Sequence, residues 1–322
     1  ILNSVENNNF DVRSSISYAK ISKAQRDAQH ALRYPTLTAG TQLSKSSTLL
    51  NSTGLNSNKP FVFNSYGSQL GISGFEFDIW GRLRSLDDAA LARTFSAQKL
   101  IDFALVEAYS DALLNYYELI YAYQILHVLE KKSLLFQKMS VHFNELNAQG
   151  YLSELERKQW LLSVGQLQKD VNLLTQNIHE INGRLFKVSG IKDFLHHRQA
   201  PIPSSNILFD VLALNVSTES LLSRPDVAFA ESNILQANGN IGAARAAFLP
   251  NISLNVLFGR TSVFFSSQLD NLGQNWQVSL PIVSNIFDFG KNKSRLNEAY
   301  ATKEHLVIEY QKSLAVAYQQ VQ

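Results

Sequence analysis

The 68 residues from 82 to 149 contain neither glycine nor proline, and this stretch constrains the fold more than any other feature. Glycine and proline are the residues that most destabilise the interior of an α-helix. Apolar residues recur here at steps of three and four, which is typical of one helix face; they are Leu105, Ala108, Tyr109, Ala112, Leu113, Tyr116, Ile120 and Tyr123. A helix of this length spans about 100 Å, so the sequence predicts a strut or the wall of a tube.

A membrane-spanning helix is the alternative for the apolar segment 113–129. This segment carries four polar residues, Asn115, Glu118, Gln124 and His127. It is also shorter than the roughly 20 residues that a helix needs to cross a bilayer, so the sequence favours the strut.

Composition excludes some classes of protein. A net charge of +2 gives no electrostatic argument for nucleic acid as a partner. The absence of cysteine excludes disulfides and thiolate metal sites. A hydrophobic content of 45% is enough to bury a core, so the chain is expected to fold.

The segments around the long helix follow one order, which the chain uses twice. In the first half the patterns predict helix, strand, polar loop, strand, long helix and return helix, at residues 11–34, 37–44, 46–64, 66–79, 82–149 and 153–188. In the second half they predict helix, strand, strand and helix, at residues 226–249, 252–258, 276–282 and 291–322. A shift of the apolar register in the second strand predicts a β-bulge near Gly74.

The two halves align at nearly constant offsets. Three residue pairs define these offsets: Asp11 and Asp226, Pro35 and Pro250, and Gly81 and Gly290. We therefore predict two internal repeats joined by a linker, with residues 1–190 as the first repeat, 191–222 as the linker and 223–322 as the second repeat. Because the first repeat includes a return helix, we expect the second to be truncated at Gln322 and the chain to be a fragment.

The four predicted strands are about 10 residues long with alternating faces, as in transmembrane β-strands. Four strands cannot close a barrel, since the smallest membrane barrels have about eight, whereas three copies would pool twelve. Aromatic residues near the strand ends fit a girdle at the membrane interface; they are Phe61, Phe63, Tyr66, Phe258 and Trp276. The alternative is that they form the core of a small soluble sheet.

Several segments resemble those of the TolC-like outer-membrane efflux channels, especially the branch paired with resistance-nodulation-division pumps. These segments are Phe75-Glu-Phe-Asp-Ile-Trp-Gly-Arg-Leu-Arg-Ser85 with Ala89-Ala-Leu-Ala-Arg93, Arg224-Pro-Asp-Val227, Asn240-Ile-Gly-Ala-Ala-Arg-Ala-Ala-Phe-Leu-Pro250, and Pro281 to Gly290. The resemblance extends over nearly the whole chain.

The resemblance implies an α+β membrane protein of the bacterial outer membrane with a periplasmic extension. It implies a homotrimer in which long helical hairpins form a periplasmic barrel and four strands per chain contribute to a twelve-stranded transmembrane β-barrel. The implied function is a passive exit duct for drugs or other small toxic solutes. The implied partners are outer-membrane lipid, a periplasmic adaptor of the membrane fusion protein class and an inner-membrane pump.

The sequence departs from this family in three respects. The lipid-bearing N-terminal cysteine of many family members, which are lipoproteins, is absent. The linker from Ile202 to Ser217 differs from the usual short one. The family's gate involves the tip of the second hairpin, so no gate residue can be assigned in this chain.

The predicted turn between the long helix and its return helix comprises Gly150, Tyr151, Leu152 and Ser153. Gly150 suits the left-handed conformation that ends a helix, and Ser153 with Glu156 makes a capping box. One interpretation is simply a well-made helical turn. In the other, an apolar apex about 100 Å from the membrane contacts another protein. In the resembled family this tip docks against the adaptor.

Paired basic residues follow a glycine at both predicted strand-to-helix junctions. These residues are Gly81, Arg82 and Arg84 at the first junction, and Gly290, Lys291 and Lys293 at the second. The cations either bind lipid phosphates at the inner surface of the membrane or only solvate the junction, and solvation is slightly preferred.

No set of residues has the spacing of a catalytic or metal site, so we expect no reaction, cofactor or bound metal. His196 and His197 are adjacent and would point apart on regular structure. Asp87 and Asp88 fall in the first turns of the long helix, where carboxylates favour the helix dipole, so a structural role is preferred. Three Asn-x-Ser/Thr triplets, which we expect to be inert in a bacterial protein, begin at Asn51, Asn215 and Asn251.

The sequence therefore favours one subunit of an efflux duct. A duct for type I protein secretion is the alternative within the same fold. A soluble periplasmic coiled-coil adaptor or scaffold is the alternative from another class, and the alternating strand pairs argue against it.

Overall fold

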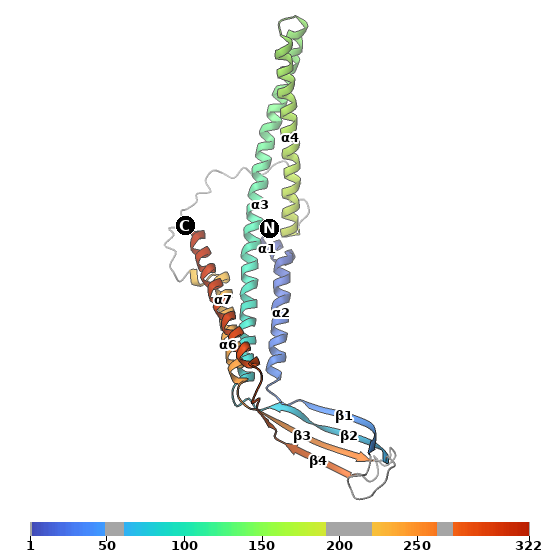
Figure 1. Ribbon diagram of the computed structural model, residues 1–322. Helices are drawn as coiled ribbons and strands as arrows, with labels where there is room; N and C mark the ends of the chain where they lie inside the picture. Colours follow the sequence, from blue (N-terminus) through green and yellow to red (C-terminus); the bar gives the residue numbers. More distant parts are fainter. Residues whose placement is uncertain (1, 49–60, 191–220, 263–272, 322) are drawn as a thin grey trace. The chain divides into compact units, whose positions relative to one another are not determined.

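The computed structural model describes residues 2–48, 61–190, 221–262 and 273–321. The elements follow one another as α1 (Leu2–Asn8), α2 (Phe10–Ala31), β1 (Leu37–Thr48), β2 (Phe61–Glu76), α3 (Arg82–Ala148), α4 (Glu154–Ser189), α6 (Pro225–Ala246), β3 (Asn251–Ser262), β4 (Gly273–Ser279), β5 (Ile282–Val283) and α7 (Lys291–Val321) (Figure 1). They fall into two compact units, Ile1–Ala19 with Gln98–Asp226, and Lys20–Ala97 with Val227–Gln322.

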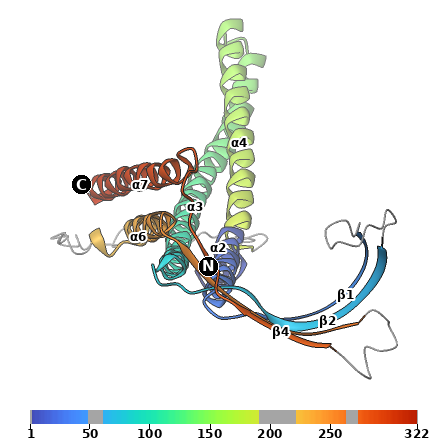
Figure 2. The ribbon, with the colours of Figure 1, turned by 60° about the horizontal axis from the view of Figure 1, so that its bottom comes forward.

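The predicted long helix is confirmed as α3, which runs unbroken for 67 residues. In the first unit, α3 and α4 lie side by side as a hairpin (Figures 1 and 2). Their contact buries one apolar cluster, which comprises Leu119, Ala122, Ile178, Ile181 and Leu185. Within the described residues, no helix combines the length and apolar character that crossing a bilayer requires.

Aromatic stacking joins α3 to α4 nearer the tip of the hairpin. The ring of Trp160 on α4 lies parallel to that of Phe143 on α3, with a centroid separation of 4.5 Å and an interplanar angle of 3°. The indole N–H of Trp160 donates to the Ser140 hydroxyl at 3.1 Å, so this half-buried polar group keeps a partner.

Helix α1 was not predicted, because seven residues give too little periodicity to identify a helix. Asn9 separates it from α2 and is buried. The side-chain oxygen of Asn9 accepts from the amide of Asp11 at 2.8 Å, and its amide donates to the Val188 carbonyl at 3.1 Å. Asn9 therefore caps α2 and ties it to the end of α4.

The second unit contains an antiparallel sheet in the order β1-β2-β3-β4, which curves in Figure 2. The predicted bulge is confirmed, since the β2–β3 register shifts between Ile72 and Phe75 and Gly74 adopts a φ of 67°. The Asn255 side chain accepts from the Gly74 amide at 2.7 Å. This bond satisfies a backbone group that the bulge leaves out of the ladder.

Several predicted boundaries in the sheet are wrong, including the end of the second strand, which was expected at residue 79 but lies at Glu76. Residues 46–48 and 61–64, expected in a loop, belong to β1 and β2. Residues 46–48 are Ser and Thr, which fit a strand wherever a partner strand, here residues 61–63, supplies hydrogen bonds. Conversely, β4 ends at Ser279 rather than reaching residue 282. Pro281 has no N–H to donate to the ladder, and only the short β5 resumes the pairing.

Helix α6 packs closely against the first turns of α3 in the same unit. A Cβ atom placed on Gly239 would lie 2.7 Å from the Ser85 carbonyl oxygen and 2.8 Å from the Ala89 methyl group. The absence of a side chain at Gly239 therefore permits the approach. Farther along the contact, the Ser96 hydroxyl bonds to the Asn233 side chain at 2.8 Å.

Candidate functional site

The tip of the α3–α4 hairpin forms as the sequence predicts. Gly150 has a φ of 75°, its amide bonds to the Asn147 carbonyl at 3.1 Å, and the Tyr151 amide bonds to the Leu146 carbonyl at 3.0 Å. This pair of bonds is the Schellman motif, which satisfies the last carbonyls of a helix. Ser153 then opens α4 with both bonds of a capping box to Glu156. The turn is thus defined entirely by local bonds.

The apex of this turn presents apolar surface to solvent. The Tyr151 side chain is 76% exposed, Leu152 is half-buried, and Leu155 in the first turn of α4 is 66% exposed. The nearest charged side chains pair with each other, since Arg157 bonds to Glu154 at 2.9 Å. The apex therefore offers an apolar contact surface bordered by an ion pair.

The first strand-to-helix junction is held by bonds from several directions. The carboxylate of Asp78 accepts from the amides of Leu83 at 2.9 Å and Arg84 at 2.7 Å, which caps α3. The indole N–H of Trp80 donates to the Pro250 carbonyl at 2.8 Å. Arg82 makes two bonds to Glu76, at 2.9 and 2.6 Å. Arg82 is therefore bound to a carboxylate, whereas the two predicted partners of this cation were lipid phosphate and water.

Burial and the neighbouring Glu76 carboxylate have opposite effects on the pKa of Arg82. The hydrogen bonds that the guanidinium donates to Glu76 raise its pKa and outweigh the opposing effect of burial. Arg84, two residues later, is exposed.

An aspartate also caps the second junction, although it accepts from other backbone amides. The Asp288 carboxylate accepts from the amides of Asn292 at 2.9 Å and Gly290 at 3.0 Å, and these bonds lower its pKa. Gly290 has a φ of 84°, close to the 73° of Gly81 at the first junction. Lys291 and Lys293 are exposed. Three apolar side chains just before the helix are also exposed, Ile286 by 100%, Phe287 by 74% and Phe289 by 90%.

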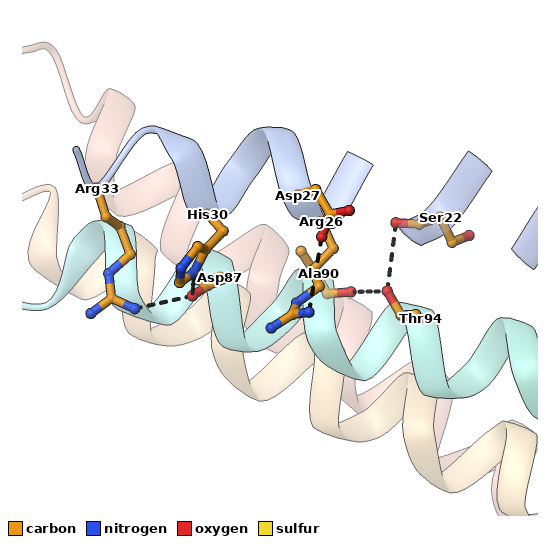
Figure 3. A network of polar contacts seen from close by, with 8 residues as sticks. All are labelled: Ser22, Arg26, Asp27, His30, Arg33, Asp87, Ala90 and Thr94. Carbon is orange, nitrogen blue, oxygen red and sulfur yellow. Dashed lines mark hydrogen bonds and ion pairs between the residues drawn. The ribbon is translucent and has the colours of Figure 1, made fainter. Parts of the chain in front are cut away.

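A row of polar contacts links α2 to α3 in the second unit (Figure 3). The His30 ring Nδ1–H donates to Asp87 Oδ2 at 2.8 Å, and the Arg33 guanidinium donates to the same oxygen at 3.1 Å. Two turns farther, the Thr94 hydroxyl lies 3.5 Å from the Ser22 carbonyl and 3.0 Å from that of Ala90. The network is visible in the sequence only as polar residues at helical spacing on α2.

Asp87 is the centre of this network and is only 7% exposed. Burial alone would raise the pKa of its carboxyl group, but the hydrogen bonds from His30 and Arg33 outweigh burial and hold the pKa below its ordinary value. The expected structural role holds, but its reason differs from the one predicted. Asp87 is the sixth residue of α3, whereas the dipole acts mainly within the first turn.

The four-stranded sheet has one apolar face and one polar face. The rows of the apolar face are Leu37, Ile72, Val256 and Val278, then Ala39, Leu70, Phe258 and Trp276. The alternate rows are polar or glycine except for Leu257, as in Gly40, Gln69, Gly259 and Asn275. The apolar side chains face solvent in the single chain, since Leu70 is 47%, Phe258 59% and Trp276 72% exposed.

Three of the predicted interface aromatics lie on the apolar face of this sheet. Phe258 and Trp276 are cross-strand partners on the apolar face, and Tyr66 pairs with Leu43 on the same face. Phe61 and Phe63 lie in β2, but their side chains are outside the described residues. Of the other predicted positions, His196, His197, Asn51 and Asn215 also fall outside the described residues, and Asn251 begins β3.

Comparison with known proteins assigns these features to one family. The family model described as outer membrane efflux protein matches residues 1–133 and 216–322. The chain belongs to the outer membrane efflux protein family. Its place is therefore the bacterial outer membrane, and its function is efflux.

Relatives of this outer membrane efflux protein come from several bacteria. It is 30% identical over 327 residues to the solvent efflux pump outer membrane protein SrpC of Pseudomonas putida, covering 100% of the chain and 67% of the relative. It is 26% identical over 317 residues to the cation efflux system protein CusC of Escherichia coli, covering 98% and 67%. The chain thus spans about two thirds of the length of these relatives.

A solved structure agrees with the fold. The Campylobacter jejuni CmeC outer membrane channel superposes with a TM-score of 0.85 at 21% identity, covering 99% of this chain and 68% of that one. At this identity the likeness concerns the helix-dominated fold with its antiparallel strands.

Proposed function

We propose that this outer membrane efflux protein is one of three subunits of a passive exit duct for small toxic solutes. The observation that carries the proposal is the sheet, whose apolar face is exposed in the single chain and whose other face is polar. Such an alternation is the pattern of a barrel with lipid outside and water inside. A soluble sheet core would instead need a second layer over Leu70, Phe258 and Trp276.

The edges of the sheet support assembly from several copies. In the described sheet, β1 and β4 each have a strand partner on one side only. An open edge exposes backbone N–H and C=O groups, which must be paired within a bilayer. Pairing β4 of one copy with β1 of the next in three copies gives twelve strands, whereas one copy has too few to close a barrel.

The two halves of the chain are proposed to be structural repeats, with boundaries at residues 1–190, 191–222 and 223–322. Both strand-to-helix junctions place an Asp cap before a glycine of positive φ, which supports this division. Arg84, Lys291 and Lys293, which are exposed at these junctions, are proposed to contact lipid phosphates at the periplasmic surface.

The hairpin tip is proposed as the docking site for a periplasmic adaptor that links the duct to an inner-membrane pump. The exposed Tyr151 and half-buried Leu152 supply the apolar contact. Small solutes are favoured over secreted proteins as cargo, because SrpC is named for solvent efflux and CusC for cation efflux.

The first test is the protein mass of the full-length, detergent-extracted protein by light scattering. A mass of three chains, followed by single-channel conductance in a bilayer, is the expected result. A monomer without conductance would overturn the proposal.

The tip assignment has its own test. Leu152→Asp places a charge in the apolar apex, so we expect export of a toxic dye to be lost while the trimer and its conductance persist. Ser163→Asp adds the same charge at an exposed position of α4 and serves as the control. A Leu152→Asp trimer that exports as well as this control would show that the tip does not dock.

A further inference from the structure

Arg260 occupies an unusual position on the apolar face of the sheet. It pairs with Ser68 on β2 and with Gln274 on β4, in the row next to Leu70, Phe258 and Trp276. Residues of one strand that are two apart share a face, so the guanidinium of Arg260 projects on the same side as the Phe258 ring. Trp276 is its diagonal neighbour across the β3–β4 ladder, within reach of a long side chain.

The charges in the sheet are distributed unevenly between its ends. In the described strands β1 to β4, the charged residues are Lys45, Glu76 and Arg260. Glu76 lies at the helix end, where it is bound to Arg82. Lys45 lies on the same face as Arg260 and farther toward the opposite end, where β1 and β3 finish. That end of the apolar face therefore carries two cations and, in the described strands, no carboxylate.

A cation on a lipid-facing surface is costly at the bilayer centre but nearly free at the interface. Aromatic residues such as Phe258 and Trp276 mark that interface, where long basic side chains reach the headgroups. A groove of about 690 Å³ begins at Arg260 and continues over Ala39, Leu70, Phe258 and Trp276. A charged end and an apolar floor match a molecule with a phosphate headgroup and an acyl chain.

We propose that Arg260 binds a phosphate of a phosphorylated lipid headgroup in the outer leaflet, with the lipid's acyl chain lying over Phe258 and Trp276. The planar guanidinium fork suits two phosphate oxygens, and the neighbouring Gln274 amide and Ser68 hydroxyl are additional donors. The inference rests on the proposed function, because only a lipid-facing sheet brings Arg260 to a headgroup.

The test uses the full-length protein in detergent, after removal of native lipid, with bisphosphorylated lipid A as the probe. Dephosphorylated lipid A with the same acyl chains is the reference, and binding is measured by native mass spectrometry. The wild-type protein is expected to prefer the phosphorylated form, and Arg260→Gln to weaken its binding about tenfold. Arg13→Gln, which removes an exposed arginine of α2, is the control.

A second variant separates a lipid site from a general effect of charge. Exchanging Arg260→Thr together with Thr261→Arg keeps the composition but moves the guanidinium to the polar face. We expect this exchange to lose the phosphate preference as Arg260→Gln does, and Arg260→Lys to retain part of it. Equal binding by wild type, Arg260→Gln and the exchanged protein would overturn the inference.

Three further outcomes are informative. Displacement of the lipid by millimolar inorganic phosphate would identify an ordinary anion site and overturn the lipid assignment. A wild-type protein that is trimeric and conducts, yet shows no phosphate preference, would remove this inference alone. A monomer without conductance would remove the proposed duct as well.

Discussion

Helices α2 and α6 end in the same way, 215 residues apart. In α2 the amides of Arg33 and Tyr34 bond to the carbonyls of His30 and Ala31, each at 3.1 Å. At the corresponding positions of α6, the amides of Phe248 and Leu249 bond to the carbonyls of Arg245 and Ala246, at 3.2 and 3.0 Å. A proline follows each end, at Pro35 and Pro250, and cannot continue the helix.

The side chains at these two helix ends make different contacts with the long helices α3 and α7. His30 and Arg33 both bond to the buried carboxylate of Asp87 on α3. Arg245 occupies the position of His30, but the position of Asp87 on α7 is Leu296. Arg245 instead bonds to the Tyr300 hydroxyl, one turn farther, and lies 5.7 Å from the centre of its ring.

The helix ends and the contacts between helices depend on different parts of the sequence. The helix ends depend on local sequence, so they are alike wherever the proline and the turn residues are alike. The contact between helices depends on a residue more than 50 positions away, so it changes when one partner changes. We therefore expect disruption of the α2–α3 contact to have a larger effect than disruption of the α6–α7 contact.

The largest effect is expected from Asp87→Ala. This change leaves His30 and Arg33 without their common acceptor, at a cost of about 2 kcal/mol in the stability of the α2–α3 contact. Hydrogen exchange of the α2 amides in the full-length protein should become roughly 30-fold faster. Exchange in α6 and α7 should change little, and equal acceleration in both helix pairs would contradict the comparison.

The same contact should respond to acid. Because the pKa of Asp87 in the folded protein is lower than in the unfolded chain, the unfolded chain binds more protons between the two values. The stability that Asp87 contributes is thus complete above its ordinary pKa of about 4 and is lost as the pH falls through its lowered folded pKa.

Exchange measured between pH 6 and pH 3 tests this expectation. The rates must first be corrected for the intrinsic effect of pH on exchange. Protection of α2 should then fall more steeply in the wild-type protein than in Asp87→Asn, which has no carboxylate to titrate. Identical pH profiles for the two proteins would show that the bonds to Asp87 do not set the stability of α2.

Substitution of the helix caps tests whether local sequence determines the ends of the helices. Asp78→Ala and Asp288→Ala each remove the carboxylate that accepts two backbone amides at the start of a long helix. We expect exchange in the first turns of α3 and α7 to rise by a similar factor, roughly fivefold. A much larger effect at Asp288 would indicate that its helix start depends on more than the local cap.

The features predicted from sequence are those that local signals determine. The unbroken α3, the turn at Gly150, the capping box at Ser153 and the bulge at Gly74 each follow from nearby residues. Their signals are the absence of helix breakers, a left-handed glycine, a hydroxyl three residues before a carboxylate, and a shift of register.

The features that the sequence did not reveal depend on distant partners. Residues 46–48 were expected in a loop because serine and threonine favour turns, but a facing strand makes them part of the ladder. The bonds to Asp87 were missed for the same reason. The polar stripe of Ser22, Arg26 and Arg33 is visible at helical spacing, but no local pattern identifies Asp87 as the carboxylate that Arg33 contacts.

The smallest effect is expected from Tyr300→Phe. This variant removes the hydroxyl that accepts from Arg245 and keeps the ring, so the cation–π contact persists. Arg245 is exposed and Tyr300 is 42% exposed, so water replaces the lost acceptor at little cost. Exchange in α6 should rise by only about twofold.

Leu296→Asp supplies the reciprocal test, because it places a carboxylate on α7 at the position that Asp87 occupies on α3. If position and burial together create the strong contact, Arg245 should pair with this carboxylate, and protection of α6 should become sensitive to acid as it is in α2. A Leu296→Asp protein whose α6 exchanges independently of pH would show that matching positions do not suffice. The burial that surrounds Asp87, rather than its place in the repeat, would then account for the difference between the two helix pairs.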